Sequence, residues 1–131
     1  MADLFSEAWM KRFGEEWNKE AKLAADLAKI NFASTIAYGF TGEAQPRGFI
    51  QVQNGQVVAS GVYAGQTLNW DLRASPENWQ KWIEKGLGMM GLGMAYTTGK
   101  IKFQVGDYGA MIKEPRMAGP FIESFSVMGR V

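Results

Sequence analysis

The sequence predicts an α+β fold, and three observations lead to that class. Residues 3–32 repeat apolar side chains at helical intervals. Five later segments instead alternate apolar and polar side chains in steps of two, as strands with one buried face do. Helical spacing returns after the fourth and after the fifth of these segments. At 131 residues we expect one domain, residues 1–131, around one core.

The first predicted element is a single long helix from residue 3 to about residue 32. Its apolar stripe consists of Trp9, Phe13, Trp17, Leu23, Leu27 and Ile30. Packing in the core is the favoured interpretation of the aromatic part of this stripe. Docking onto a partner protein is the alternative, because tryptophan often anchors interfaces.

Five strands are predicted next, in STIAYGFTG (34–42), GFIQVQNG (48–55), QVVASGVYAG (56–65), TLNWDLRAS (67–75) and KIKFQVGD (100–107). Asn54-Gly55 favours the positive φ angles of a tight hairpin, so the second and third strands should be antiparallel. The fourth strand turns Asp71 and Arg73 to its polar face. The fifth points Ile101, Phe103 and Val105 inward.

A helix is predicted after the fourth strand, in SPENWQKWIEK, where Ser75 can cap the helix and Pro76 suits its first position. It runs into GLGMMGLG, residues 86–93, which contains the spacing G-x-G-x-x-G. A dinucleotide-binding loop requires a strand before the glycines, so the preceding helix argues against a nucleotide site. Four glycines within these residues indicate a helix break or the close approach of another surface.

Continuing the helical count through the glycines predicts one long apolar face. It holds Trp79, Trp82, Ile83, Leu87, Met90 and Met94, and Leu92 falls nearly opposite. The C-terminal part should form a short helical turn at Met111 and a final helix from Pro120 to Gly129, after a break at Pro115 or Gly119. That helix presents Phe121, Ile122, Phe125 and Met128. Methionines in this half of the chain either fill an irregular core or line a surface for variable apolar shapes.

Composition excludes several classes of site. The chain has no cysteine and no histidine, which rules out a disulfide framework, a Cys/His zinc site and a Ser-His-Asp triad. A net charge of +1 gives no broad field for nucleic acid or an anionic membrane, although it leaves local patches open. No stretch is apolar for long enough to cross a membrane, and residues 1–17 lack a signal-peptide pattern, so we expect a soluble, cytoplasmic protein.

The order of these elements resembles the sterol carrier protein 2 family. The resemblance lies in LNWDLRASPENWQKWIEKGLG (68–88) and in YTTGKIKFQVGD (96–107), where Gly99, Lys100, Ile101, Lys102 and Gly106 fall in the place of a Gly-Lys-Leu-Lys-like strand start of that family. It implies a five-stranded mixed sheet covered on one face by helices, with an apolar tunnel between them. It also implies noncatalytic binding of fatty acids, acyl-coenzyme A thioesters, sterols or similar lipids. The chain ends Met-Gly-Arg-Val, so the resemblance gives no support for a peroxisomal address.

We therefore expect a carrier or presenter of hydrophobic ligands without cofactor or metal, and Met90→Glu should weaken ligand binding. The predicted ligand-binding residues are Trp79, Trp82, Ile83, Leu87, Met90, Met94, Phe103, Met111, Phe121, Phe125 and Met128. Two alternatives stay open: an accessory subunit or homo-oligomer that docks through Trp9, Trp17, Trp79 and the final helix, and an enzyme that uses carboxylates alone. Asp71, Glu77, Asp107 and Glu114 are the candidate carboxylates, although structural roles are favoured for them.

Overall fold

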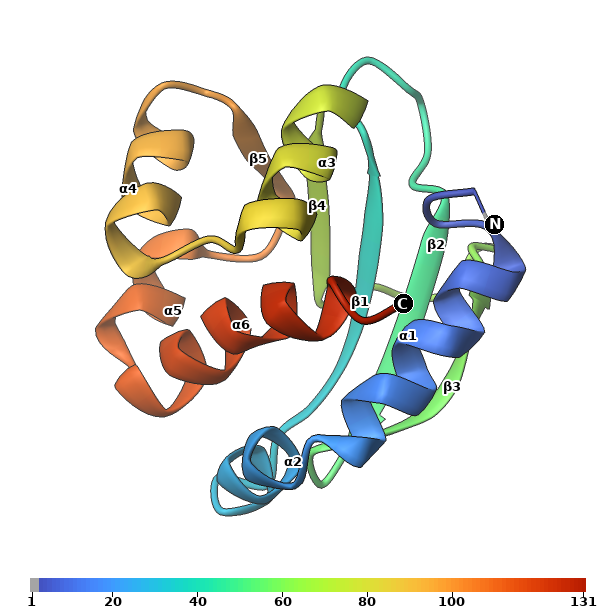
Figure 1. Cartoon of the computed structure of the whole chain (residues 1–131), viewed down its shortest axis with the longest axis vertical. Coiled ribbons are helices and arrows are strands. Elements are labelled where there is room, and N and C mark those ends of the chain that lie inside the picture. The colour runs from blue at the N-terminus through green and yellow to red at the C-terminus, as the bar shows by residue number, and fades with distance from the viewer. Residues whose placement is uncertain (1–2) are drawn as a thin grey trace.

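The computed structural model describes residues 3–131, in which helices pack against one face of a five-stranded sheet (Figure 1). The elements are α1 (Glu7–Lys19), α2 (Ala21–Ala28), β1 (Ala33–Phe40), β2 (Gly48–Gln53), β3 (Gln56–Val62), β4 (Trp70–Ala74), α3 (Pro76–Lys85), α4 (Met89–Thr97), β5 (Ile101–Val105), α5 (Tyr108–Lys113) and α6 (Pro115–Met128). The strand order is β3-β2-β1-β4-β5. Among the strands of the described residues, only β1 and β4 pair in parallel. The predicted α+β class and the mixed sheet are confirmed.

The predicted hairpin joins β2 to β3. Asn54 and Gly55 have φ angles of 49° and 81°, as a tight turn of this kind requires. The turn is also fixed to α1, because the indole nitrogen of Trp17 donates a hydrogen bond of 2.9 Å to the Gly55 carbonyl. The Asn18 side chain pairs with both backbone groups of Val57. The hairpin therefore anchors the first helix on the sheet.

The predicted single helix over residues 3–32 is wrong, because the chain breaks at Glu20 into α1 and α2. No proline or glycine marks this break. It turns α2 so that Leu23 and Leu27 are buried, while Arg130 of the C-terminus pairs with Glu20 at 2.7 Å. Gly14, in contrast, stays within α1, where a Cβ atom would lie 3.0 Å from a methyl carbon of Val57. Packing against other elements, rather than helix propensity, sets both features.

Of the two interpretations of the glycines in residues 86–93, the helix break is confirmed, so the helical face counted through residues 79–94 is not continuous. Helix α3 ends at Gly86, whose φ of 78° only glycine adopts easily, and α4 begins three residues later. The break resets the helical phase. As a result Leu92 is fully buried, whereas Met90 and Met94 are 87% and 68% exposed.

The last helix begins earlier than predicted. Glu114 caps α6 by accepting a hydrogen bond from the backbone nitrogen of Arg116, and Pro115 takes the first helical position. Pro120 lies inside this helix instead of starting it. The short helix around Met111 is confirmed as α5. Of the three side chains predicted inward on β5, Val105 is 40% exposed at the end of the strand.

An aromatic cluster forms the centre of the core between α1, α3, α6 and the sheet. It joins Phe5, Trp9, Phe13, Trp17, Tyr38, Trp79, Trp82 and Phe125 through ring contacts of 5.2–6.3 Å between centroids. Trp9, Trp17 and Trp79 are all buried. The core interpretation of the first stripe is confirmed, and docking through these tryptophans is wrong because no partner can reach them.

Candidate ligand-binding pocket

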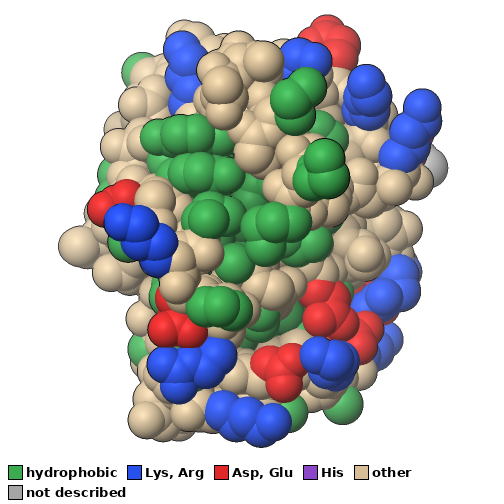
Figure 2. Space-filling model, turned by 90° about the vertical axis from the view of Figure 1, so that its left-hand side faces the viewer, with side chains coloured by type: hydrophobic (Ala, Val, Ile, Leu, Met, Phe, Trp, Pro, Cys, Tyr) green, Lys and Arg blue, Asp and Glu red, His purple; other side chains and the backbone are tan. Residues whose placement is uncertain are grey.

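An apolar pocket lies between the helix-covered face of the sheet and the C-terminal helices. Its lining residues come from α1, α2, β1, β4, β5, α5 and α6 and from the loop before β1, and all are apolar: Trp17, Leu27, Phe32, Ile36, Trp70, Leu72, Phe103, Met111, Met117 and Phe121. Phe32, Trp70, Phe103, Met117 and Phe121 are only partly buried, so they form the rim. Near this region, hydrophobic side chains gather on the side of the molecule that carries α4, α5 and β5 (Figure 2).

The pocket is narrow. Its cavity volume is about 30 Å³, although the hollow measures about 410 Å³ when its open mouth is included. The smaller figure decides what fits, because a single water needs roughly 10–15 Å³ on that measure. A hydrocarbon chain therefore enters only if lining side chains move. Met111 and Met117 are suited to this, since thioether side chains change rotamer easily.

Parallel pairing of β1 with β4 builds the floor of the pocket. Ile36 pairs with Trp70 across these strands, and Leu72 pairs with Phe103 on β5. The period-two pattern turns all four side chains toward the helices. A cross-strand ring contact of 6.0 Å between Trp70 and Phe103 closes the floor at its outer side.

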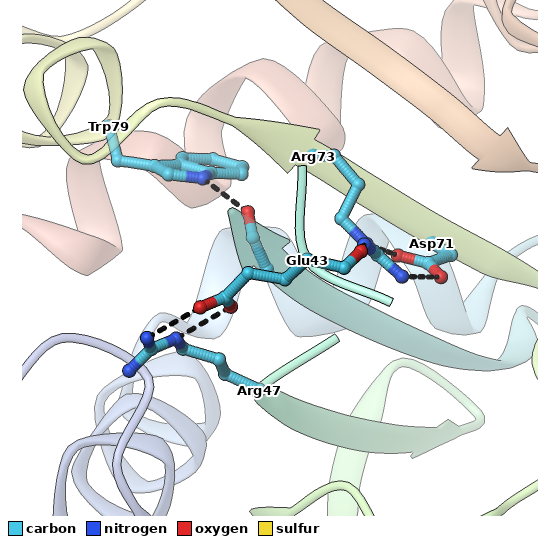
Figure 3. A network of polar contacts seen from close by, with 6 residues as sticks. Glu43, Arg47, Asp71, Arg73 and Trp79 are labelled. Carbon is cyan, nitrogen blue, oxygen red and sulfur yellow. Dashed lines mark hydrogen bonds and ion pairs between the residues drawn. The ribbon is translucent and has the colours of Figure 1, made fainter. Parts of the chain in front are cut away.

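The structure brings three of the predicted ligand-binding residues to this pocket: Phe103, Met111 and Phe121. Four others, Trp79, Trp82, Phe125 and Met128, are buried in the adjoining core. The indole nitrogen of Trp79 is already used, because it donates to the Gly39 carbonyl at 2.8 Å (Figure 3). A ligand role for these core residues stays a prediction.

The remaining predicted residues lie away from the pocket. Ile83 borders a surface groove between α1, α3 and the C-terminus. Leu87 and Met94 border another groove, between α3 and α4, and Met90 projects into solvent. Their role in ligand binding stays a prediction that the pocket geometry does not favour.

Sequence reasoning missed seven lining residues: Trp17, Leu27, Phe32, Ile36, Trp70, Leu72 and Met117. Alternation did assign the inward strand residues to the core side of the sheet. What the sequence does not show is that β4 pairs with β1 and not with β3, which precedes it in the chain. Without that pairing, Ile36 and Trp70 give no sign that they share a wall.

The candidate catalytic carboxylate Asp71 lies on the sheet face opposite the pocket, in a buried ion pair with Arg73 (Figure 3). Arg73 donates to the two carboxylate oxygens at 2.6 and 2.9 Å and to the Glu43 carbonyl at 2.8 Å. The Glu43 carboxylate in turn accepts two hydrogen bonds from Arg47. The predicted placement of Asp71 and Arg73 on the same face of β4 is confirmed, but that face is not solvated, because the segment around Glu43 covers it.

The other candidate carboxylates lie at helix starts. Glu77 is in the first turn of α3, and Asp107 caps α5 by accepting from the Ala110 backbone nitrogen at 3.1 Å. Hydrogen bonds from Arg116 lower the pKa of Glu114. Within residues 3–131, no cluster of three or more potential metal-ligating side chains occurs, and no helix combines the length and apolarity needed to cross a bilayer. None of the four carboxylates lines the pocket.

Solved structures with the same architecture identify the fold. A crystal structure of sterol carrier protein 2 superimposes with a TM-score of 0.75 and 18% sequence identity, over 98% of this chain and 99% of that one. The chain has the sterol carrier protein 2 fold. A conserved hypothetical protein of Thermus thermophilus, described as possibly a sterol carrier protein, also gives a TM-score of 0.75, at 16% identity over 98% of this chain and 89% of that one.

A third structure with the sterol carrier protein 2 fold is a ubiquinone synthesis protein, UbiJ. Its TM-score is 0.60 at 10% identity, over 93% of this chain and 88% of that one. No protein-family model matches the sequence, and no curated protein matches it significantly. The likeness therefore lies in the fold, and the earlier resemblance is confirmed at that level.

Proposed function

We propose that residues 1–131 act as one lipid-binding domain, which holds the apolar part of a fatty acid, acyl-coenzyme A, sterol or similar molecule in the pocket between the sheet and α5–α6. The observation that carries this proposal is that all ten lining residues are apolar. The names of two proteins that share the fold, a sterol carrier protein and a possible one, support it. We expect the protein to act in the cytoplasm, by binding and presenting or transferring its ligand.

Moving an acyl chain from water into the pocket supplies enough free energy for lipid binding. Each buried methylene contributes about 0.8 kcal/mol, so roughly ten methylenes give about 8 kcal/mol before losses. A micromolar Kd corresponds to about 8 kcal/mol. Side chains that must move, such as Met111 and Met117, reduce this gain. We therefore expect micromolar affinities with loose discrimination between chain lengths, because few polar groups orient the guest.

The placement of the carboxylates supports a noncatalytic role. Asp71 forms a buried ion pair with Arg73 on the sheet face opposite the pocket. Asp107 and Glu114 accept backbone hydrogen bonds at helix starts. A general acid or base must reach the reacting atoms, and a guest in the pocket would meet only hydrocarbon, aromatic and thioether groups.

The test is a titration with a fluorescent fatty acid, together with native mass spectrometry of freshly purified protein for a retained lipid. Met117→Trp narrows the pocket at its rim and should weaken binding tenfold or more. Val58→Trp is the matched control, since Val58 is 55% exposed on the edge strand β3 and should leave affinity unchanged. Equal affinities for both variants, or no saturable binding across fatty acids, acyl thioesters and sterols, would contradict the proposal.

An accessory role beside an enzyme with apolar substrates is the second candidate. The observation that favours it is that the fold also occurs in a ubiquinone synthesis protein. Burial of Trp9, Trp17 and Trp79 removes those residues as a docking surface. Light scattering and affinity capture from native extract test this role. A monomer that captures no enzyme would leave the carrier as the favoured function.

A further inference from the structure

Helix α4 exposes apolar side chains where a surface helix normally carries charges. Met89, Met90 and Met94 are 46%, 87% and 68% exposed, and Tyr96 is 43% exposed. The whole segment from residue 86 to residue 99 contains no charged residue. A helix on the surface of a soluble domain usually turns polar and charged residues toward water. Several exposed apolar side chains on one short helix indicate a binding surface, and Figure 2 shows hydrophobic side chains gathered on this side of the molecule.

Lysines border the apolar helix. Lys85 precedes the uncharged segment and Lys100 follows it. These two and Lys81 line the groove between α3 and α4 together with Met94, and no acidic residue lines that groove. All three lysines are exposed, and within residues 3–131 none of them forms an ion pair. The groove is therefore open to a ligand that is both apolar and negatively charged.

The neighbouring acidic side chain points elsewhere. Glu84 of α3 accepts a hydrogen bond from Gln80 and lines a different groove, beside α1. Asp107 is engaged as the cap of α5. The groove between α3 and α4 thus has three basic and no acidic lining side chains, even though the net charge of the chain is only +1.

Charge decides between the possible occupants of this surface. A second copy of the chain would bring the same lysines face to face across a twofold axis, so like charges would oppose each other. Protein interfaces with apolar centres are depleted in lysine. A bilayer that contains anionic phospholipid accepts both features, because apolar side chains enter the boundary between headgroups and acyl chains while lysine stems extend to the phosphates.

We propose that α4 docks on an anionic phospholipid surface, with Met89, Met90 and Met94 in the headgroup–acyl boundary and Lys81, Lys85 and Lys100 on lipid phosphates. Tyr96 lies at the level where aromatic residues favour the membrane interface. The helix is too short and too glycine-rich to insert across the bilayer, so it lies on the surface.

The same helix adjoins the pocket wall. Tyr96 stacks on Tyr108 with centroids 3.9 Å apart, Tyr108 contacts Phe103 at 5.4 Å, and Phe103 contacts Phe121 at 6.3 Å. Docking through α4 therefore brings the aromatic rim of the pocket close to the lipid surface. The docking itself does not depend on a ligand in the pocket, so it goes beyond the proposed function and is tested separately.

The experiment is flotation of the full chain with vesicles of phosphatidylcholine alone or with about one third phosphatidylglycerol. We expect binding to the anionic vesicles only, weakened by salt. Lys85→Ala with Lys100→Ala should weaken it about 25-fold, because each lysine near an anionic surface contributes on the order of fivefold. Met90→Glu should reduce the bound fraction to that on phosphatidylcholine alone.

Two controls make the test specific. Lys11→Ala removes a positive charge from α1, and Val58→Glu adds a negative charge at an exposed apolar position on β3. Both should bind vesicles like the parent. Met90→Glu should also keep its affinity for a soluble fluorescent fatty acid, which separates docking from the pocket.

Three results would overturn the proposal. The first is folded parent protein that fails to bind anionic vesicles. The second is a loss for Lys11→Ala as large as that for the Lys85/Lys100 pair, because binding would then follow overall charge. The third is a dimer or protein complex that Met90→Glu disrupts in the absence of any vesicle binding, which would assign α4 to a protein interface.

Discussion

Replacing Arg73 by methionine tests the assignment of Asp71 to a structural ion pair. The side chains of Arg73 and Asp71 are only 4% and 6% exposed. The substitution removes the guanidinium group from two carboxylate oxygens and from the Glu43 carbonyl, at distances of 2.6–2.9 Å. A buried carboxylate is then left without its partner. Methionine retains the apolar stem, so the lost hydrogen bonds and charge dominate the effect.

The expected cost is about 3–5 kcal/mol of unfolding free energy, the scale found when one partner of a buried pair is removed. With a urea m-value of about 2 kcal/mol/M, the midpoint should fall by roughly 2 M. The double variant Asp71→Leu/Arg73→Met removes both charges. It should recover most of the loss, because only the Glu43 carbonyl is left without a partner.

The assay is equilibrium urea unfolding followed by tryptophan fluorescence. Arg116→Met is the matched control, since Arg116 forms a similar two-point contact with Glu114 but is largely exposed. The control should change the midpoint little. An Arg73→Met midpoint no lower than that of the control would refute the structural role of the pair, as would a double variant no more stable than Arg73→Met alone.

Three further predictions concern the core, the hairpin and one surface carboxylate. Trp79→Phe should lower the unfolding free energy measured in urea by about 2–4 kcal/mol, because the Gly39 carbonyl loses its donor and a cavity remains. A tenfold loss of ligand affinity in the folded variant would instead place Trp79 at the ligand. Gly55→Ala should be more destabilising than Gly65→Ala. Both glycines have positive φ, which costs alanine about 1–2 kcal/mol, but only at Gly55 would a Cβ atom also clash with the Ala24 carbonyl. Equal decreases in melting temperature would contradict this prediction. Arg116→Met should raise the pKa of Glu114 in an NMR titration, because hydrogen bonds from Arg116 lower that pKa. The stability that this contact adds is present above the ordinary pKa of glutamate and is lost as the pH falls through the lowered pKa of Glu114. An unchanged titration would count against the contact.

Local patterns predicted most elements because the signals act over a few residues. Alternation located the strands, Asn54-Gly55 located the hairpin, and Ser75-Pro76 located the start of α3. The break at Glu20 had no such signal, since it depends on how α2 packs against α6. The glycines of residues 86–93 indicated a helix break, but not that the break rotates α4 relative to α3. The helical count therefore placed Met90 on the same apolar face as Trp79 and Trp82.

The pocket was harder to predict than the fold. Phe103 was identified from strand alternation, and Met111 and Phe121 were identified through the family resemblance. Ile36 and Trp70 join them only through the parallel pairing of β1 with β4. Pairing between strands far apart in the chain is decided by the whole fold, and no local spacing encodes it. Trp79 lies in the core beside the pocket, because a large aromatic residue at helical spacing suits a core as well as a binding site.

Intermolecular NOEs between an unlabelled saturated fatty acid and protein with ¹³C-labelled methionine methyl groups test the central claim most directly. The methionines report on different regions, because Met111 and Met117 line the pocket, Met10 is buried in the core and Met90 is exposed on α4. The account predicts NOEs from the acyl methylene protons to Met111 and Met117 and none to Met10 or Met90. Contacts with Met90 but not with Met111 and Met117 would contradict it.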